Sequence, residues 1–104
     1  MDNPLDDLRV HAVDYDKQLA DAVPEHLREG LARYLLDGGM PGSFLRSFLQ
    51  NDLFCTLGRA DEVSLAALPA MMRFMHSCAP YAAYGNSHAV IAWSAKGGYR
   101  GRAA

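Results

Sequence analysis

The sequence is poor in features that define several classes of protein. Two cysteines among 104 residues are too few for a disulfide-stapled scaffold. There is no apolar run of about 18 residues and no basic start followed by an apolar stretch, so neither a membrane span nor a secretory signal is predicted. We therefore expect a cytoplasmic protein with reduced thiols and no membrane partner.

Acidic residues are absent from Val63 to Ala104, a segment that holds four basic residues. Residues 1–25, in contrast, hold seven acidic residues and only two basic ones, although the net charge of the whole chain is only -2. This asymmetry has two interpretations. The two ends could steer different partners, or they could attract each other across one fold.

Strand patterns are also missing. No stretch alternates strictly between apolar and polar residues, and no hairpin dipeptide lies between strand-forming runs. A composition of 50% hydrophobic and 21% charged residues is that of one globular domain. We predict an all-α single domain, a small bundle of four to five short helices. Residues 1–23 form an acidic N-terminal helix or arm, 24–96 the helical core domain, and 97–104 a flexible basic tail.

The helices are predicted from apolar spacing and from residues typical of helix ends. Asn3 and Pro4 suit the start of a first helix that carries apolar residues at steps of three and four as far as Ala22. A second helix opens at Pro24 and stops at Gly38. A third follows Gly42 and ends at Gly58, with a broad apolar stripe that we expect to be largely buried. The stripe consists of Phe44, Leu45, Phe48, Leu49, Leu53 and Leu57.

Asp61 is the predicted N-cap of a fourth helix, in which we expect Pro69 to cause a kink. Its inward residues are predicted to be Leu65, Leu68, Met72 and Met75, with Met71 and Phe74 beside them. An aromatic loop over 81–85 follows. Asn86 or Ser87 then caps a short last helix that contains Val90, Ile91 and Trp93.

No catalytic or metal-binding constellation emerges. The possible ligands are Cys55, His76 and Cys78 with His11, His26 or His88, yet the sequence has no paired CxxC or HxxxH unit. Cys78 with His88, or Ser43 with a carboxylate, lacks the strand-turn-helix elbow or glycine-rich frame of a nucleophilic site. We predict no enzyme activity, no cofactor, no metal and no small-molecule substrate.

Two kinds of residue are candidates for binding at the C-terminal end. Aromatic side chains gather late in the chain, where they serve either as interface anchors or as ordinary core; they are Tyr81, Tyr84, Trp93 and Tyr99. Basic residues there give an alternative hypothesis, a nucleic-acid-binding or regulatory module that contacts phosphates. Its predicted contact residues are Arg73, Lys96, Arg100 and Arg102.

From Pro24 to Arg102 the sequence resembles a group of small helical phage and prophage proteins. The residues that carry the resemblance are Arg33-Tyr34, Pro41-Gly42-Ser43-Phe44-Leu45, Asn51-Asp52-Leu53, Gly58-Arg59-Ala60-Asp61, Phe74, Ala79-Pro80, Trp93 and Gly97-Gly98. The chain departs from the group's pattern at Met40, where a second proline is usual, and in its acidic first 22 residues. The resemblance implies a mobile-element setting in which small proteins bind and block host machinery.

Our leading hypothesis is a phage or prophage protein that binds a host protein complex stoichiometrically, as an inhibitor of host defence of the anti-CRISPR type. A row of carboxylates on the first helix could compete for a basic channel meant for nucleic acid. The predicted partner-binding residues are Asp6, Asp7, Asp14, Asp16 and Asp21. Binding through the aromatic end is a variant of this hypothesis, and the oligomeric state stays open.

Overall fold

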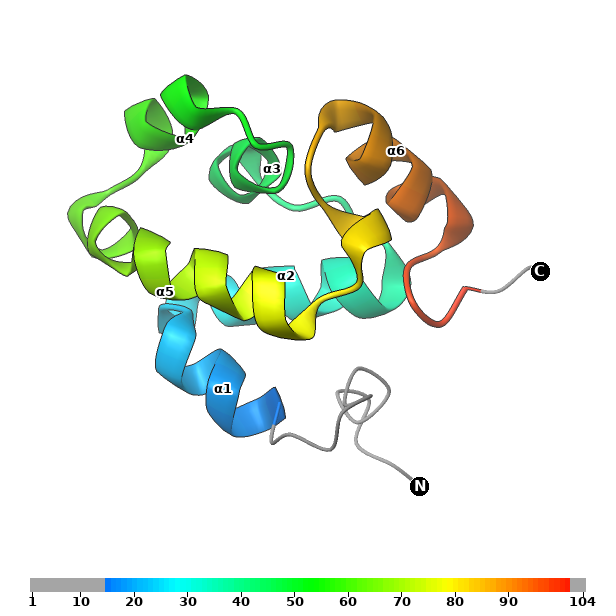
Figure 1. Ribbon diagram of the computed structural model, residues 1–104, viewed down its shortest axis with the longest axis horizontal. Helices are drawn as coiled ribbons and strands as arrows, with labels where there is room; N and C mark the ends of the chain where they lie inside the picture. Colours follow the sequence, from blue (N-terminus) through cyan, green and yellow to red (C-terminus); the bar gives the residue numbers. More distant parts are fainter. Residues whose placement is uncertain (1–14, 102–104) are drawn as a thin grey trace.

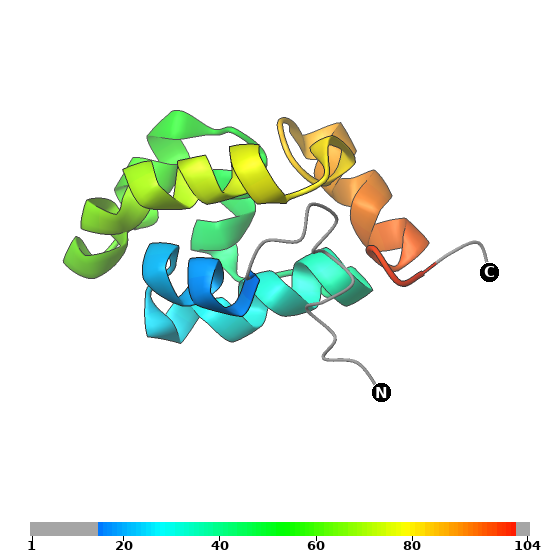
Figure 2. The ribbon, with the colours of Figure 1, turned by 60° about the horizontal axis from the view of Figure 1, so that its bottom comes forward.

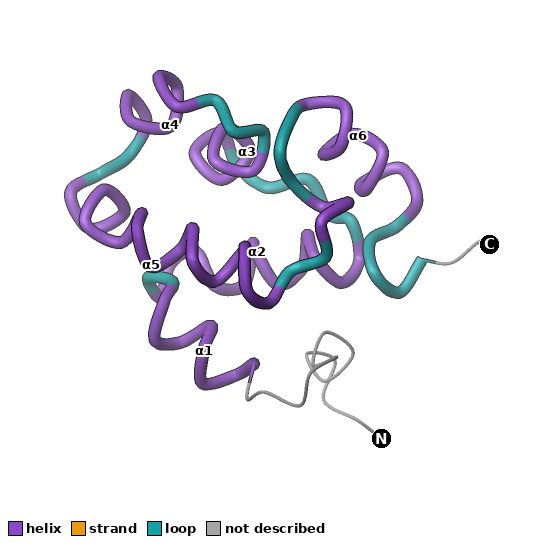
Figure 3. The backbone as a smooth tube through the Cα atoms, viewed as in Figure 1, coloured by secondary structure: helices purple, strands orange, loops and turns teal. Residues whose placement is uncertain are grey.

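The structure, a computed structural model, describes residues 15–101, with side chains from Lys17 onward. This part of the chain contains helices and loops but no strand (Figure 3), which confirms the all-α prediction. The elements are α1 (Tyr15–Ala22), α2 (Glu25–Asp37), α3 (Ser43–Leu49), α4 (Leu53–Arg59), α5 (Glu62–Cys78), the 3-10 helix η2 (Tyr81–Ala83) and α6 (Ser87–Lys96).

Two groups of helices build the molecule (Figure 1). α1 packs on α5 and α2, whereas α3 packs on α4 and α6, and η2 packs on α6. In Figure 2, α1 and α2 lie together on one side and α5 lies on the other. The Cα radius of gyration is 12.8 Å, close to the value of about 13 Å typical of a single domain of this length.

Several predicted helix ends are confirmed. α2 begins directly after Pro24 and ends at Gly38, which adopts the left-handed conformation with φ of 78°. The side chains of Asp61 and Asn86 accept hydrogen bonds from backbone N–H groups in the first turns of α5 and α6, as N-caps do. α5 runs through Pro69 and begins seven residues before it, so the proline is not its start.

The prediction of one long third helix is wrong, because the chain breaks at Asn51. This residue has φ of 64°, the left-handed conformation that ends a helix and that asparagine tolerates better than most residues. Asp52 then caps a new helix by accepting a hydrogen bond from the Cys55 N–H at 3.2 Å. The stripe from Phe44 to Leu57 is therefore divided between α3 and α4.

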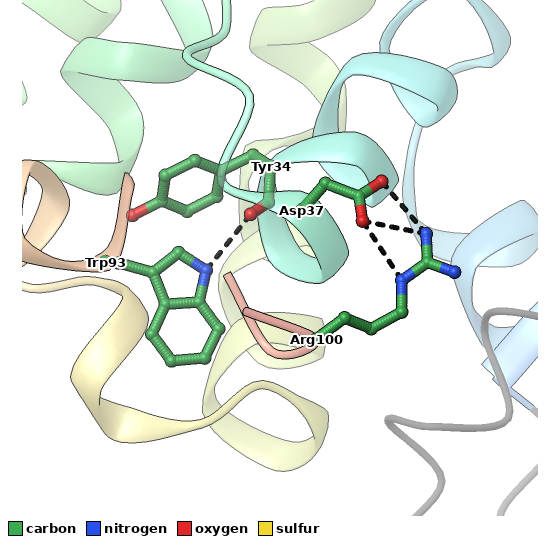
Figure 4. A network of polar contacts seen from close by, with 4 residues as sticks. All are labelled: Tyr34, Asp37, Trp93 and Arg100. Atoms are coloured by element: carbon green, nitrogen blue, oxygen red, sulfur yellow. Dashed lines mark hydrogen bonds and ion pairs between the residues drawn. The ribbon is translucent and has the colours of Figure 1, made fainter. Parts of the chain in front are cut away.

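The core is organised around Tyr34, a fully buried residue of α2. Its hydroxyl donates to the Ala83 carbonyl at 2.6 Å, and its own carbonyl accepts from the Trp93 indole N–H at 3.0 Å (Figure 4). Burial raises the pKa of the Tyr34 phenol, so the group remains a hydrogen-bond donor at physiological pH. The Tyr34 hydroxyl thus connects α2 to η2, and the Tyr34 carbonyl connects α2 to α6.

The segment after α6 differs from the flexible tail that the sequence predicted. Tyr99 and Arg100 donate their backbone N–H groups, each at 2.8 Å, to the carbonyls of Leu35 and Leu36 in the last turn of α2. The Arg100 guanidinium also makes a bidentate contact with Asp37 (Figure 4). These bonds attach the segment as far as Arg100, whereas 102–104 lie outside the described residues.

Glycine is required where this segment meets α2. Gly98 has φ of 74°, and a Cβ added there would lie 2.5 Å from the backbone nitrogen of Gly38. Because the contacted atoms belong to the backbone, a side-chain movement cannot relieve the clash.

We expect Gly98→Ala to lower the free energy of unfolding by at least about 1 kcal/mol, the cost of a left-handed residue with a Cβ. Gly58→Ala is the matched control, because no atom lies within 4 Å of its added Cβ and its φ is ordinary. Chemical denaturation followed by circular dichroism measures both variants. Equal free energies of unfolding for the two variants would show that the close contact between Gly98 and α2 does not require glycine.

We also expect Tyr34→Phe to cost about 1–3 kcal/mol, because it removes the donor to the buried Ala83 carbonyl and leaves that acceptor without its partner. Tyr81→Phe, on a side chain that is 76% exposed, should change stability by less than about 0.5 kcal/mol. The same denaturation measurement applies, and an unchanged midpoint for Tyr34→Phe would contradict the anchoring role.

Candidate functional site

The structure tests little of the predicted acidic row. Asp6, Asp7 and Asp14 lie outside the described residues. Asp16 lies within α1, and Asp21 is exposed on the same helix, where its carboxylate accepts a hydrogen bond from Lys17 Nζ at 3.0 Å. The described part of the chain therefore offers one of the five carboxylates for analysis, and that one already has a cationic neighbour.

The predicted basic contacts come from more than one element of the fold. Lys96 lies over the Trp93 ring, with Nζ 4.5 Å from the ring centroid, and Arg100 is held by Asp37. Arg73 lies on α5, in a shallow pocket that Asp21 of α1 also lines. Arg102 is outside the described residues. Two of the three described cations thus have intramolecular partners.

The cysteines and histidines also lie apart. In residues 17–101, no group of three or more His, Cys, Asp or Glu side chains is arranged to hold a metal ion. Cys78 is buried, and burial raises the pKa of its thiol. The pKa of the Cys55 thiol is raised chiefly by its hydrogen bond to the Asp52 carboxylate. A raised pKa disfavours the thiolate, which is the nucleophilic form.

The side chains that stand out instead are apolar residues of α5 that the fold leaves uncovered. The sequence predicted Leu65 and Met72 to face inward, but they are exposed, Met72 by 59%. The buried face of α5 consists of Ser64, Met71, Phe74, Met75 and Cys78. Leu65, Leu68 and Met72 follow the three- and four-residue steps of a second apolar face, beside the buried one.

α4 shows the same departure from the predicted burial. Leu53 and Phe54 are 62% and 87% exposed, and Leu57 is exposed as well. The break at Asn51 is the reason, because it separates α4 from the axis of α3, whose Leu45 and Leu49 are buried in the core. The predicted burial of the stripe is therefore right for the α3 half and wrong for the α4 half.

A cavity of about 230 Å³ lies between these two uncovered faces. Its walls come from α3, α4, α5 and the loop between η2 and α6. Most of its lining is apolar, and the residues include Phe48, Leu53, Leu68, Met72, Met75 and Tyr84. We call this cavity, together with the exposed apolar residues of the two helices, the α4–α5 groove; these residues are Leu53, Phe54 and Leu57 of α4 and Leu65 and Met72 of α5.

Short backbone and side-chain bonds fix the polar end of the α4–α5 groove. Gly85 donates its N–H to the Leu49 carbonyl at 2.8 Å, which joins the loop before α6 to the end of α3. Thr56 lines the cavity and donates its hydroxyl to the Asp52 carbonyl at 2.6 Å. Asn51 also lines the cavity, so the residue that breaks the helix also contributes to the wall.

Two ionisable residues belong to the segments that build this end. Asp52 is exposed between the lining residues Asn51 and Leu53, and its hydrogen bond from the Cys55 N–H lowers the pKa of its carboxyl. Asp52 is therefore charged at neutral pH. Tyr84 has the opposite environment, because partial burial, and secondarily Tyr81, raise the pKa of its phenol. The groove thus has an apolar interior and a neutral phenol in its wall.

Comparison of the chain with protein-family models, curated proteins and solved structures found no match. The resemblance to phage and prophage proteins therefore stays a prediction. In addition, none of the helices in residues 15–101 combines the length and apolar character needed to cross a membrane.

Sequence reasoning missed the α4–α5 groove, although two signals for it were present. Asn51-Asp52 combines a residue that tolerates the left-handed conformation with a good N-cap, which is the signature of one helix ending and another beginning. α5 also has more apolar residues than one buried face requires. Only packing could show which of its faces the rest of the chain covers.

If the rim of the α4–α5 groove does not contribute to folding, polar substitutions there should be tolerated. We expect Phe54→Ser to change the free energy of unfolding by less than about 0.5 kcal/mol, because the side chain is 87% exposed. Leu49→Ala, in the buried core, should cost about 2–5 kcal/mol. Thermal denaturation of both variants tests this, and a large loss for Phe54→Ser would assign that ring to the core.

Proposed function

We propose that this protein acts by binding another protein stoichiometrically, with the α4–α5 groove as its binding surface. The observation that carries the proposal is the set of exposed apolar side chains on two helices, α4 and α5, that both line one apolar cavity. Scattered apolar residues are normal on a surface, whereas a contiguous patch with a cavity is typical of an interaction site. Large side chains anchored in such pockets supply most of the energy of many interfaces.

The size of the cavity favours a protein partner over a free small molecule. Pockets for drug-sized ligands occupy about 300–1,000 Å³ and bury most of the ligand. The α4–α5 groove has about 230 Å³ and an apolar rim that extends beyond it onto α4 and α5. A protein partner could fill the cavity with one or two side chains and cover the exposed apolar residues of α4 and α5 with others.

The alternative of phosphate binding by the basic C-terminal half has less support. Phosphate-driven binding needs many free cations, and affinities with strong salt dependence come from about six or more contacts. Lys96 and Arg100 already contact Trp93 and Asp37, and Arg73 lies on another helix.

The resemblance described above suggests which kind of partner is bound. It favours a host defence complex, inhibited by occupation of a site that the complex needs, as in anti-CRISPR proteins. In this proposal the α4–α5 groove replaces the acidic row as the main binding surface, and the carboxylates of residues 1–21 remain a second candidate.

Selection of peptides from a random display library tests the proposed function. Wild-type protein is the target, and Met72→Asp, which should fold because the side chain is exposed, is used for counter-selection. We expect selected peptides to bind wild type and to lose at least about tenfold in affinity for Met72→Asp, since a buried unpaired charge is costly.

Amide chemical shifts of the labelled protein show where a selected peptide binds. Shifts concentrated at Leu53, Met72 and Tyr84 support the proposal. Recovery of no specific peptide, or of peptides whose shifts map to α1 or α6 and whose affinity is unchanged by Met72→Asp, would contradict it.

A further inference from the structure

We propose that a second copy of this chain occupies the α4–α5 groove when no other partner is bound, so that two copies pair face to face through α4 and α5. The pairing covers the surface that the proposed function assigns to a partner, and the two occupants therefore compete. The inference shares the surface of the proposed function but does not depend on the partner. It rests on the area of the exposed apolar side chains, on their uncharged surroundings and on the shape of the groove.

The apolar side chains of α4 and α5 form one connected surface. Side chains three or four positions apart are neighbours on a helix, which places Leu57 beside both Leu53 and Phe54 on α4. The same spacing places Leu68 beside Met72 on α5. Leu53, Leu68 and Met72 line the same cavity, so the faces of the two helices meet there. Figure 1 shows α4 and the beginning of α5 at the same end of the molecule.

The area of this surface is large enough for a stable pair. The five exposed residues of the groove include Leu53, Phe54 and Met72, each more than half exposed. We estimate that the five present about 500 Å² of mostly apolar surface, since one large side chain can bury on the order of 150–250 Å². A standard interface buries about 1,200–2,000 Å² in total, of which about 60% is apolar. Two copies would cover about 1,000 Å² of apolar surface, which lies within that range.

The sequence of this surface carries no charge that would oppose pairing with an identical copy. In a two-fold pair the same patch is used by both subunits, so a charge at the centre of the patch would lie close to its own copy. The stretches 53–58 and 63–72, which supply the exposed residues of α4 and α5, contain no Asp, Glu, Lys, Arg or His. Charged residues are depleted at the centres of protein interfaces for the same reason. Pairing through these stretches brings no like charges together.

The groove also has a shape that complements itself. Phe54 is 87% exposed, and Leu53, the residue before it, lines the cavity of about 230 Å³. An apolar cavity of about 150 Å³ is large enough for benzene, so this one accommodates a phenyl ring. Met72 and Met75 line it, and contacts between methionine sulfur and an aromatic ring are favourable. In the proposed pair, the Phe54 ring of each copy enters the cavity of the other, as two-fold symmetry requires.

Sedimentation velocity of the full-length chain, at protein concentrations up to about 300 μM, tests the pairing because the population of a dimer depends on concentration. Met72→Asp is the informative variant. Ile91→Asp is the matched control, because Ile91 of α6 is 57% exposed against 59% for Met72, does not line the cavity and receives the same change of charge. Circular dichroism at about 5 μM, where we expect the chain to be monomeric, checks that both variants fold.

We expect wild type and Ile91→Asp to form a dimer with a dissociation constant on the order of 10–100 μM, as for an interface of modest area. Met72→Asp should weaken this dimer by at least about tenfold, because pairing would bury two unpaired carboxylates. Phe54→Ser should weaken it by a similar factor, since it removes both inserted rings. The affinity of the wild-type dimer should not fall as the salt concentration rises, unlike that of a pair held by charges.

Two results would overturn the inference: a wild-type chain that stays monomeric throughout this range, and a dimer that Met72→Asp leaves intact. Display-selected peptides separate this inference from the proposed function. If such peptides bind at the groove of a monomeric wild-type chain, the proposed function stands and this inference fails. If the dimer forms as expected and no peptide is recovered, this inference stands and the proposed function fails. Where both are found, a peptide that binds the groove should dissociate the dimer, and a dimer that persists with the peptide bound would contradict the competition.

Discussion

The rest of the structure depends on how Tyr34 satisfies its polar atoms inside the core. A buried phenol without a hydrogen-bond partner would cost several times the free energy that one hydrogen bond contributes. The Ala83 carbonyl, which accepts from this phenol, is therefore held beside it. The carbonyl of the same residue accepts from the Trp93 indole, which sets where α6 crosses α2. The pairing of Tyr99 and Arg100 with the end of α2 extends this connection. α2 thus serves as the element on which η2, α6 and the segment after α6 are placed.

This arrangement leaves α4 and one face of α5 with few partners. α1 and the core cover the other side of α5, and the loop after η2 is held at the end of α3 by the bond from Gly85 to Leu49. The chain breaks at Asn51 between α3 and α4, and although these two short helices pack on each other, Leu53, Phe54 and Leu57 of α4 stay exposed. The cavity and its exposed apolar rim follow from these constraints. Folding alone does not require that rim, because the side chains on it are in contact with solvent.

These properties of the site are the ground for the proposed function, in which another protein covers it. Its interior is apolar, and its methionines have unbranched side chains that adapt to groups of different shape. The hypothesis drawn from sequence, a protein that works by binding another protein, is unchanged in class. What the proposed function changes is the surface, since it assigns the main driving force of binding to the burial of apolar side chains.

The sequence by itself determined the helical class, because apolar spacing and capping are local properties that each segment carries alone. Pro24, Gly38, Asp61 and Asn86 marked helix ends correctly for that reason. Tertiary structure decided which apolar face is covered. Met71 and Met72 are adjacent and chemically identical, yet one is fully buried and the other exposed, because burial depends on which side of α5 the rest of the fold, α1 included, covers. It also decided that the residues after α6 pair with α2, since the carbonyls of Leu35 and Leu36 are more than sixty positions away in sequence. Periodicity shows that a face is apolar; only packing shows what it faces.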